Sequence, residues 1–469
     1  MTVMCGIVGS TIPNSLIVDL LGKLGHRGDV GCGVAILGQK LWKVVKDLGP
    51  VTSLKPIGGF SPSKMSLGHT RYATNGDLSI QNLQPMTVVR GNIAFVFNGN
   101  VFNYQSEETW LCEQGYVFRS DGDSERLATS FSYRLKDFQK TTHSFEEALE
   151  RTLNHIAHAF DGAYSCIAAS SEWGMVGFRD RRGVRPLEGL QTESGFILAS
   201  ESVVFPERLC SHGHRFEVSN FGYVWIDLSN QLVEGLYNQG EDLEPRSLCF
   251  MEIAYFAHRD SVLDGLSILK AREYLGRALG VQVLQQIQDL SDLVVVPIPK
   301  TSLDIAPLIA QVMDVDCEPN VITVLDPNLR TFIQPTSEER RRAVKKKFAF
   351  SKPSKRRVLL VDDSICRGTT LKEIVSILRG LGIEWIGCAS ATPPVKYSAV
   401  YGIEMGNVDQ LIAAQCDTQE NMRIALGLDL LIMASPTKVS EVILSLRSKI
   451  DSLTMEYLTN HYPLGHPRP

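Results

Sequence analysis

Short apolar runs separated by polar, turn-forming residues dominate the first 240 positions. NIAFVFNGNV, YSCIAASSEWGMVGFRD, GFILASES and GYVWIDL are rich in Val, Ile and aromatic residues, and Gly, Asn and Asp interrupt them. Such runs are typical of β-strands. The stretch EEALERTLNHIAHAF instead places Ala148, Leu149, Leu153, Ile156 and Ala157 at helical spacing. The pattern predicts a β-rich layered domain whose sheets are covered by helices.

The rhythm changes after NQGEDLEPRS, a polar stretch that we interpret as a linker. Beyond it, DLVVVPIP and RRVLLVDD are continuous apolar runs, as expected of strands buried on both faces of a parallel sheet. A helical pattern follows each run: SLDIAPLIAQVM after the first and TTLKEIVSILRGLG after the second, with an apolar stripe at Leu371, Ile374, Val375 and Leu378. This alternation predicts a doubly wound α/β domain.

Composition limits the possible functions. A chain of 469 residues exceeds what one hydrophobic core usually supports, so we expect two domains. The net charge of -5 argues against a chain built to coat nucleic acid or an anionic membrane. Ten cysteines occur without any C-x-x-C pair, which favours reduced thiols over structural zinc or a redox pair. With no targeting or membrane-spanning pattern in the sequence, we expect a cytoplasmic protein.

The most specific stretch is VLLVDDSICRGTT. An apolar strand brings Asp362 and Asp363 to its carboxyl end, where open α/β sheets bind ligands. The loop that follows enters a helix, and backbone N–H groups at a helix N-terminus bind phosphate. The stretch predicts a site for a ribose 5-phosphate, whose hydroxyls or divalent metal would face the carboxylates. Ordinary helix capping would explain one aspartate but not the pair followed by Arg-Gly-Thr-Thr.

This stretch resembles the phosphoribosylpyrophosphate (PRPP) motif of the phosphoribosyltransferases. The resemblance implies PRPP binding by Asp362, Asp363, Ser364, Arg367, Gly368, Thr369 and Thr370, with Cys366 as a passenger. The strand VVVPIPKTS resembles the pyrophosphate loop of the same fold, which implies one Mg²⁺ per subunit at Ser302, Asp362 and Asp363. Lys300 stands where relatives often carry an acid, and it could either grip pyrophosphate or repel the metal.

The basic stretch NLRTFIQPTSEERRRAVKKKF matches the mobile loop that closes over PRPP in this family, and Arg330 and Lys347 match its basic positions. From the residues alone, RRRAVKKK could also be a solvated helix face or a nucleic-acid patch. A phosphate-clamping lid fits better, because the run is isolated in an acidic chain and lacks interleaved aromatic residues. The preceding segment 324–329 departs from the family's Lys-Asn-Arg-Tyr, so loop closure, interdomain signalling or nucleotide feedback could differ.

The opening MTVMCGIVGS raises a question about Cys5, which could simply fill space in a buried strand or act as a nucleophile. Elsewhere in this half, GHTRYATNG supplies Arg71, FVFNGN supplies Asn98 and Gly99, and SDGDSE supplies Asp123. Together these groups suit glutamine: Arg71 for its α-carboxylate, Asp123 for its α-ammonium, and Asn98 with Gly99 for an oxyanion. Singly, each has a plain interpretation as an ion pair, a hairpin turn or a helix cap.

In their order along the chain, MCGIVG, HRG, RYAT, NGN and DSE resemble the class II glutamine amidotransferase domain of the N-terminal nucleophile hydrolases, and FRDRRGVRPL and ASES continue the match. In that family the free α-amine of the cysteine is the base, which an amine titrating near pH 8 can be and a peptide nitrogen cannot. The resemblance implies that Met1 to Met4 are absent from the active enzyme, through translation from Met4 or removal of a short propeptide.

The two halves together resemble the amidophosphoribosyltransferase family, and EIAYFAHRDS and VYGIEM extend the match. The implied fold is an α+β N-terminal nucleophile hydrolase sandwich (αββα) at 5–240, an α/β type I phosphoribosyltransferase domain with a parallel sheet at 250–440, and a C-terminal helical extension and tail at 441–469. The implied reaction converts glutamine, PRPP and water into 5-phosphoribosylamine, glutamate and pyrophosphate, the first step of de novo purine biosynthesis, with ammonia passing through a shielded tunnel. The resemblance also implies a homotetramer or homodimer, purine nucleotide inhibitors, and neither nucleic acid nor membrane as a partner.

Some members of this family carry an iron–sulfur cluster on four cysteines. Cys249 matches the first ligand, but Ser398, Ala399 and Val400 stand at the second site and no cysteine follows Cys416. We therefore expect the type without a cluster. In CSHGHRF, Cys210, His212 and His214 could share a strand face as metal ligands, although a turn is favoured. A non-catalytic PRPP or nucleotide sensor, and a glutaminase serving another sugar phosphate, remain alternatives.

Overall fold

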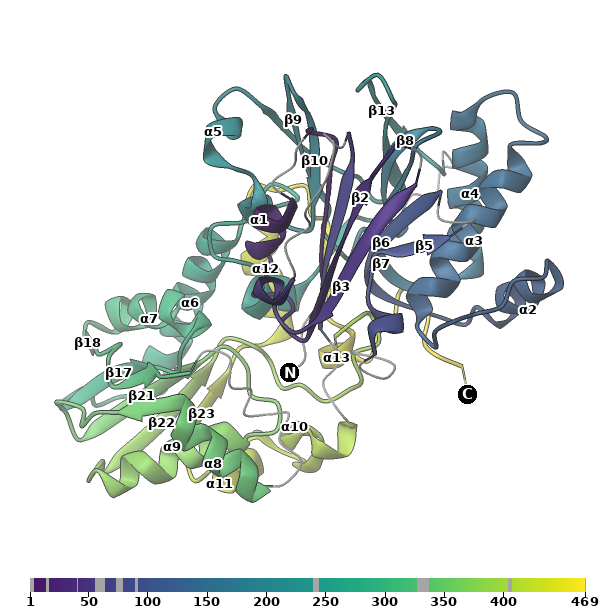
Figure 1. The fold of residues 1–469 in the computed structure, drawn as a ribbon. Coiled ribbons are helices and arrows are strands. Elements are labelled where there is room, and N and C mark those ends of the chain that lie inside the picture. The colour runs from purple at the N-terminus through teal and green to yellow at the C-terminus, as the bar shows by residue number, and fades with distance from the viewer. Residues whose placement is uncertain are drawn as a thin grey trace.

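A computed structural model describes residues 4–13, 17–39, 41–54, 64–72, 79–88, 92–238, 244–326, 337–403 and 407–468, without the side chains of 337–341. The chain forms two parts, each built around its own sheets, that lie against one another (Figure 1). Within the described residues, every helix is too short or too polar to cross a membrane.

The N-terminal part contains two antiparallel sheets, one of seven strands in the order β11-β9-β10-β1-β4-β2-β3 and one of six in the order β13-β12-β8-β7-β6-β5. The strands are β1 (Gly6–Ser10), β2 (Gly31–Leu37), β3 (Trp42–Leu48), β4 (Ser66–Arg71), β5 (Met86–Val88), β6 (Ile93–Phe102), β7 (Asp161–Ser170), β8 (Gly174–Arg179), β9 (Glu188–Thr192), β10 (Gly195–Ala199), β11 (His214–Glu217), β12 (Gly222–Ile226) and β13 (Leu232–Leu236). Apolar side chains of both sheets, including Ile7 and Val96, form one core between them. The predicted strands are confirmed.

Helices cover the outer faces of this sandwich. α3 (Asp123–Phe138) and α4 (Phe145–Ala159) pack on the six-stranded sheet, and α1 (Ile17–Gly22) packs on the seven-stranded one. In α4 the Ser144 hydroxyl accepts the N–H of Glu147 as an N-cap, and the helix buries the predicted apolar stripe except Ala157, which is half-buried. α2 (Gln105–Glu113) and α5 (Glu207–Cys210) complete this part. The αββα order of layers agrees with the prediction.

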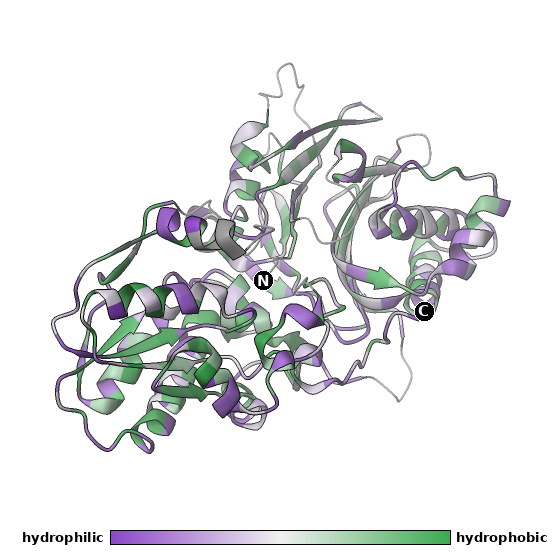
Figure 2. Cartoon of the chain, turned by 90° about the horizontal axis from the view of Figure 1, so that it is seen from below, coloured by the Kyte–Doolittle hydropathy of each residue, from purple (hydrophilic) through white to green (hydrophobic). Residues whose placement is uncertain are grey.

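The second part is built on a parallel five-stranded sheet in the order β18-β17-β21-β22-β23. Its strands are β17 (Leu293–Pro297), β18 (Asp316–Cys317), β21 (Arg357–Asp362), β22 (Trp385–Ser390) and β23 (Leu430–Met433). α6 (Ile268–Leu284) and α7 (Ala306–Met313) bury one face, while α8 (Ser337–Lys347), α9 (Thr369–Gly380) and α11 (Gln419–Leu426) bury the other. Figure 2 shows these strands as largely hydrophobic, which explains their unbroken apolar sequence.

One helix differs from its prediction. SLDIAPLIAQVM does not form a single helix, because the 3₁₀ turn η5 (Thr301–Asp304) precedes α7, which has Pro307 in its first turn. Proline fits there because the first N–H groups of a helix have no partner within the helix.

The two parts meet across a buried apolar cluster, called here the interdomain core, which includes Met4, Tyr72, Phe102, Tyr401 and Leu411. Its framework comes from the junction and the C-terminal segment: β14 (Ser247–Cys249), η4 (Glu252–Phe256), α12 (Pro436–Leu444), β24 (Ser452–Thr454) and α13 (Glu456–Thr459). β14 pairs with β24, so residues 205 positions apart join one layer. The remaining elements are β15 (Val262–Leu263), β16 (Leu266–Ser267), β19 (Ile322–Val324), β20 (Phe348–Phe350), α10 (Ile412–Gln415) and the 3₁₀ turns η1 (Val51–Ser53), η2 (Ile80–Asn82), η3 (Ser202–Val204) and η6 (Val408–Gln410).

Candidate active sites

Cys5 lies immediately before β1, next to the end of β4. Gly6 pairs with Thr70, and the Gly6 N–H donates to the Thr70 hydroxyl at 3.1 Å, which brings Cys5 beside Arg71. The Cys5 carbonyl accepts a hydrogen bond at 3.0 Å from Nε of Arg27, a fully buried side chain. The reactive end of the strand is therefore held by backbone and side-chain contacts.

A small cavity collects Cys5, Arg71, Gly99 and Asp123 of the predicted glutamine-site residues, whereas Asn98 is not among the residues that line it. Its lining consists of Cys5, His69, Arg71, Tyr72, Asn82, Gln84, Phe97, Gly99, Gly122, Asp123 and Ser124. Arg71 comes from the end of β4, Gly99 from β6 and Asp123 from the first turn of α3. His69, Tyr72 and Gln84 were not predicted, although His69 and Tyr72 stand inside the quoted GHTRYATNG.

The Asn98–Gly99 pair lies on β6 opposite Ser165 and Tyr164 of β7. Gly99 has φ 150°, and a Cβ there would stand 2.0 Å from the Ala163 carbonyl oxygen, so the position admits only glycine. The Asn98 side chain is fully buried, and neither of its amide atoms has a hydrogen-bond partner in the described part of the chain. Buried amides are usually paired, so this donor suits a ligand.

The electrostatics of this cavity favour a bound zwitterion. Burial raises the pKa of the Cys5 thiol, although the Tyr72 backbone and Arg71 oppose the change. Burial also raises the pKa of Asp123 to about 6, against the hydrogen bond at 3.1 Å from the Val101 N–H. A thiol with a raised pKa needs a base to become a nucleophile. A buried carboxylate beside an arginine could be neutralised by an ammonium group.

A network of buried ion pairs links this cavity to the junction. Arg27 donates to Glu201 Oε1 at 2.5 Å and to both carboxylate oxygens of Glu252 at 2.8 and 2.9 Å. Glu201 accepts the Ser261 hydroxyl at 2.7 Å and His26 at 2.8 Å. This network therefore joins three stretches that are far apart in the sequence: HRG, ASES and EIAYFAHRDS.

The second site lies where β17 and β21 end side by side. The loop after Asp362 runs into α9, whose N-cap is Gly368 with φ 71°, and a Cβ at Gly368 would stand 2.7 Å from Leu426. The cavity above this loop, called here the phosphate cavity, is lined by Tyr255, Ile298, Pro299, Lys347, Phe348, Asp362, Asp363, Ser364, Ile365, Cys366, Arg367, Gly368, Thr369, Thr370 and Leu371. All seven residues predicted in the PRPP motif are among them.

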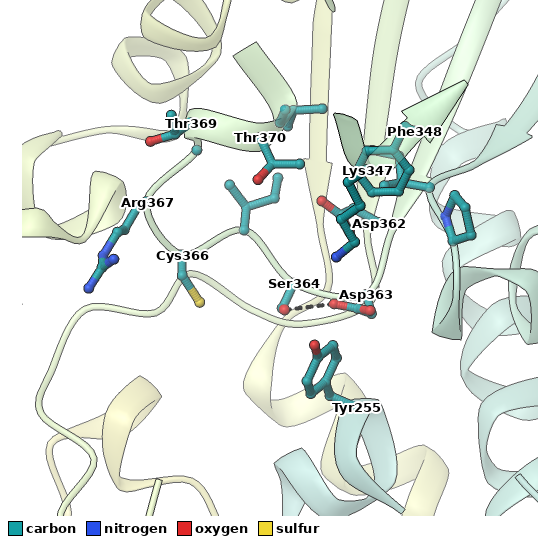
Figure 3. A pocket seen from close by; sticks show the side chains of 15 residues that line it. Tyr255, Lys347, Phe348, Asp362, Asp363, Ser364, Cys366, Arg367, Thr369 and Thr370 are labelled. Carbon is teal, nitrogen blue, oxygen red and sulfur yellow. Dashed lines mark hydrogen bonds between the residues drawn. The ribbon is translucent and has the colours of Figure 1, made fainter. Parts of the chain in front are cut away.

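The two aspartates carry an electrostatic strain that a ligand can relieve. Burial and the adjacent negative charge raise the pKa of Asp362 well above its usual range, and burial raises the pKa of Asp363, with Lys347 opposing both shifts. The Ser364 hydroxyl donates to Asp363 Oδ1 at 2.8 Å (Figure 3). In Figure 3 Lys347 lies beside the aspartates, Tyr255 faces the loop from below, and Arg367 points away from them. A cation or hydroxyl donors would complete the site.

Two residues of the predicted pyrophosphate loop do not line the phosphate cavity. Ser302 is fully buried, its hydroxyl donates to the Ile298 carbonyl at 2.5 Å, and it is not among the residues that line the described cavities. Lys300 lines a neighbouring cleft that also includes His26 and Thr301. Arg330 lies outside the described residues. Tyr255 and Phe348 line the phosphate cavity without having been predicted, although Tyr255 stands within EIAYFAHRDS.

The basic run RRRAVKKK is part of α8, on which Arg342, Lys345 and Lys346 are exposed. Ala343 and Val344 are buried, Lys345 lies 3.4 Å from Glu373, and Lys347 reaches the phosphate cavity. The helix therefore packs against α9 and brings one lysine to the site. The helix α5, a turn and β11 carry CSHGHRF, which confirms the predicted turn. No group of three His, Cys, Asp or Glu side chains suited to a metal occurs among the described residues.

These two sites define a glutamine amidotransferase joined to a phosphoribosyltransferase. Family models agree: a glutamine amidotransferase domain matches residues 69–207, and a phosphoribosyl transferase domain matches 265–398. Amidophosphoribosyltransferases of Pasteurella multocida and Escherichia coli are each 32% identical to the chain, covering 99% and 92% of it and 94% and 86% of their own lengths. The glutamine PRPP amidotransferase of B. subtilis, solved with ADP and GMP, superposes with a TM-score of 0.81 at 26% identity, over 98% of this chain and 97% of that one.

The chain therefore belongs to the amidophosphoribosyltransferase family. It is an enzyme with amidophosphoribosyltransferase activity, which is the first step of purine biosynthesis.

Proposed function

We propose that the chain hydrolyses glutamine at Cys5, passes the ammonia to PRPP, and forms 5-phosphoribosylamine, glutamate and pyrophosphate. The observation that carries this proposal is the position of the interdomain core. Tyr72, which lines the same cavity as Cys5, belongs to it, and Cys366 of the phosphate loop packs against it. A buried apolar cluster thus reaches from one candidate site to the other, and ammonia crossing it would be shielded from water.

In the first half-reaction Arg71 holds the α-carboxylate of glutamine and Asp123 its α-ammonium. The free α-amine of Cys5 takes the thiol proton, the sulfur attacks the side-chain amide, and the amine returns the proton to the departing ammonia. The Asn98 amide and the Gly99 N–H stabilise the oxyanion. Water then hydrolyses the thioester to glutamate. This mechanism requires that Met1 to Met4 be absent from the active enzyme.

In the second half-reaction the N–H groups and hydroxyls of Ser364 and 367–370 bind the 5-phosphate of PRPP. Asp362 and Asp363 face the ribose hydroxyls or one Mg²⁺ per subunit, and their raised pKa values fit a dication. When bound, Mg²⁺ would neutralise charge on the departing pyrophosphate. Lys347, together with Arg330, supplies the basic groups for the same leaving group. The Ser302 hydroxyl donates its proton to the Ile298 carbonyl, which leaves the lone pairs of its oxygen for the metal.

We infer the type without an iron–sulfur cluster. Cys249 is buried in β14, burial raises the pKa of its thiol to about 11, and serine, alanine and valine stand at 398–400 where a second ligand would be needed. Iron and acid-labile sulfide analysis of the purified protein tests this inference, and four iron atoms per chain would contradict it.

The remaining assignments follow the family. We propose domains at 5–240, 250–440 and 441–469, the last holding the end of α12, β24, α13 and the tail. The proposed partners are glutamine, PRPP, purine nucleotide inhibitors and further copies of the chain in a tetramer or dimer, without nucleic acid or membrane. All ten cysteines are unpaired, which suits a cytoplasmic enzyme.

The deciding experiment measures glutamate, pyrophosphate and phosphoribosylamine from the native protein and from Cys5→Ala, first with glutamine and then with ammonia. We expect Cys5→Ala to lose only the glutamine-dependent reaction. PRPP binding without turnover by the native protein would instead support a sensor. Glutamate release without consumption of PRPP would support another acceptor.

A further inference from the structure

Glu456, the first residue of α13, is a buried carboxylate that the reaction as described does not use. It has no exposed surface, and neither carboxylate oxygen has a side-chain hydrogen-bond partner within the described residues, although backbone groups of Glu456 and Tyr401 lie near enough to lower its pKa. The hydroxyl of the next residue, Tyr457, is also buried and unpartnered there. Buried polar groups without partners are costly and rare. Two such groups on consecutive residues indicate that Glu456 and Tyr457 have a function.

The position of Glu456 is fixed by the backbone around it. β24 pairs in parallel with β14, Ser247 and Thr454 share a hydrogen bond of 2.6 Å, and the Tyr457 carbonyl accepts the N–H groups of Lys396 and Tyr397 at 3.0 Å each. In Figure 1 α13 lies between the two parts of the molecule. Its neighbours Met455, Tyr457 and Leu458 belong to the interdomain core.

Contacts relate Glu456 to the Cys5 site. Its carboxylate is close enough to Arg185 and to the backbone of Tyr401 for both to lower its pKa. Arg185 in turn donates to the Tyr401 carbonyl at 2.9 Å. The next residue, Gly402, packs directly on Gly99 of the proposed oxyanion site. Glu456 therefore lies on the interdomain side of that site.

We propose that Glu456 is a hydrogen-bonding station for ammonia on its way from Cys5 to PRPP. This inference rests on the proposed function. Ammonia carries three N–H donors and one lone pair, so it can donate to a carboxylate or accept from a carboxylic acid. No covalent bond forms or breaks, and the molecule leaves as NH₃. The station would hold ammonia within the interdomain core until the phosphate site receives it.

The ionisation of Glu456 suits this role. Burial raises the pKa of Glu456 to about 7, although Arg185 lowers it. The groups around it are Arg185 from the loop after β8, Cys249 of β14, Glu252 of η4, and the hydroxyls of Tyr401, Tyr457 and Tyr462. Arg185 is the only cation in this set, and it lies 3.8 Å from Glu252 as well. Both protonation states are therefore populated near neutral pH.

The test uses Glu456→Gln and Glu456→Met in the full chain, with Glu441→Gln as a matched control because Glu441 pairs with Lys438 at an exposed position. The first readout is phosphoribosylamine formed per glutamate released. The second is the share of product nitrogen drawn from ¹⁵N-ammonium in solution when unlabelled glutamine is the substrate. We expect Glu456→Met to lower the product ratio at least twofold and to raise the share from solution. Glutamate release and ammonia-dependent synthesis should stay within twofold of the native rates.

Two further measurements separate this role from a structural one. The melting temperature of Glu456→Met should equal or exceed the native value, because an unpartnered buried carboxylate is removed. The native product ratio should change between pH 6 and 8, and Glu456→Gln should flatten that change. Native coupling with unchanged ratios in both variants would overturn the inference, as would a fall in glutamate release and melting temperature together. A native protein that does not couple glutamine to PRPP would instead overturn the proposed function.

Discussion

Gly402 of the second part packs against Gly99 of the first so closely that a Cβ on Gly402 would lie 2.9 Å from the Gly99 carbonyl carbon. Asn100 strengthens the same seam, because its side-chain amide donates to the Val400 carbonyl at 2.7 Å, and Phe102 stacks on Tyr401 with centroids 6.4 Å apart. The proposed oxyanion strand therefore forms part of the interdomain contact, which ties glutamine hydrolysis to the position of the second domain.

Replacing Gly402 by alanine tests this relationship. Gly402 has φ 96°, so alanine would add backbone strain as well as a contact with Gly99. We expect glutamine-dependent synthesis to fall at least tenfold while ammonia-dependent synthesis stays near native. Gly427→Ala is the control, because Gly427 has φ 72° and its Cβ would meet only Val375 at 3.8 Å. Equal losses of glutamine-dependent synthesis in Gly402→Ala and Gly427→Ala would show that backbone strain, and not the contact with Gly99, causes the effect.

Asn98 should matter to catalysis more than to binding. Its buried amide has no hydrogen-bond partner among the described residues, so Asn98→Ala removes little from the unliganded fold. Removing one oxyanion donor typically costs about 10² to 10³ in kcat. We expect that loss in steady-state glutaminase assays with KM changed only a few-fold. Asn154→Ala on the exposed side of α4 should leave both constants unchanged. A rise in KM with native kcat would argue against the oxyanion role.

The raised pKa of Asp123 predicts the pH dependence of glutamine binding. Burial raises this pKa to about 6, so the carboxyl of the free enzyme is charged above pH 6 and neutral below it. Because only the charged form attracts an α-ammonium group, kcat/KM for glutamine should fall by a further factor of about ten per pH unit below pH 6, beyond the loss caused by protonation of the Cys5 α-amine.

Asp123→Asn should raise KM by roughly 10- to 150-fold at pH 7.5, the range for a lost hydrogen bond to a charged group. It should also remove the inflection near pH 6 from the kcat/KM profile. Asp137→Asn, at the exposed C-terminal end of α3, controls for the charge change. A persistent inflection in Asp123→Asn would assign the titration to another group.

The sequence predicted those features that local physics determines. Apolar runs without polar interruption became β17 and β21, because strands covered on both faces have no solvent side. The stripe of Leu371, Ile374, Val375 and Leu378 became the buried face of α9. Cys5, Arg71, Gly99 and Asp123 line one cavity, as their chemistry suggested before any geometry was known.

Those patterns did not predict contacts between residues that are far apart in the sequence. Arg27 and Glu201 form an ion pair although they are 174 positions apart in the sequence. Hydrophobic periodicity predicts local structure only and does not predict such a pair. Tyr255 lines the phosphate cavity because η4 lies at the junction of the two parts. Local sequence propensities do not predict that position of η4. Ser302 was assigned from a resemblance, whereas its burial and its hydrogen bond to Ile298 depend on how η5 folds back on β17.

The pairing of Arg27 with Glu201 and Glu252 is the interaction whose loss should cost most stability. All three side chains are fully buried. Although burial alone would raise it, the charges of His26 and Arg27 hold the pKa of Glu201 well below its usual range. This contribution is present above the unfolded pKa of about 4.3 and is lost as pH falls through the lower folded value. Arg27→Met would remove the closest cation from two buried carboxylates and leave only His26 beside Glu201 and Arg185 at 3.8 Å from Glu252, at a cost of about 3–5 kcal/mol.

In Arg27→Met the sign of the pH effect should reverse. The stranded carboxylates would have raised folded pKa values, so the folded state would take up protons before the unfolded state does. Stability of the variant should therefore increase as pH falls from 7 toward 5, and the gap to the native protein should narrow. Urea unfolding at several pH values measures the free energy of unfolding of the variant and its difference from that of the native protein. Arg151→Met, which breaks an exposed pair with Glu147, should cost less than about 1 kcal/mol at every pH. A gap between native and Arg27→Met protein that stays constant from pH 7 to 5 would show that the carboxylates find another cation.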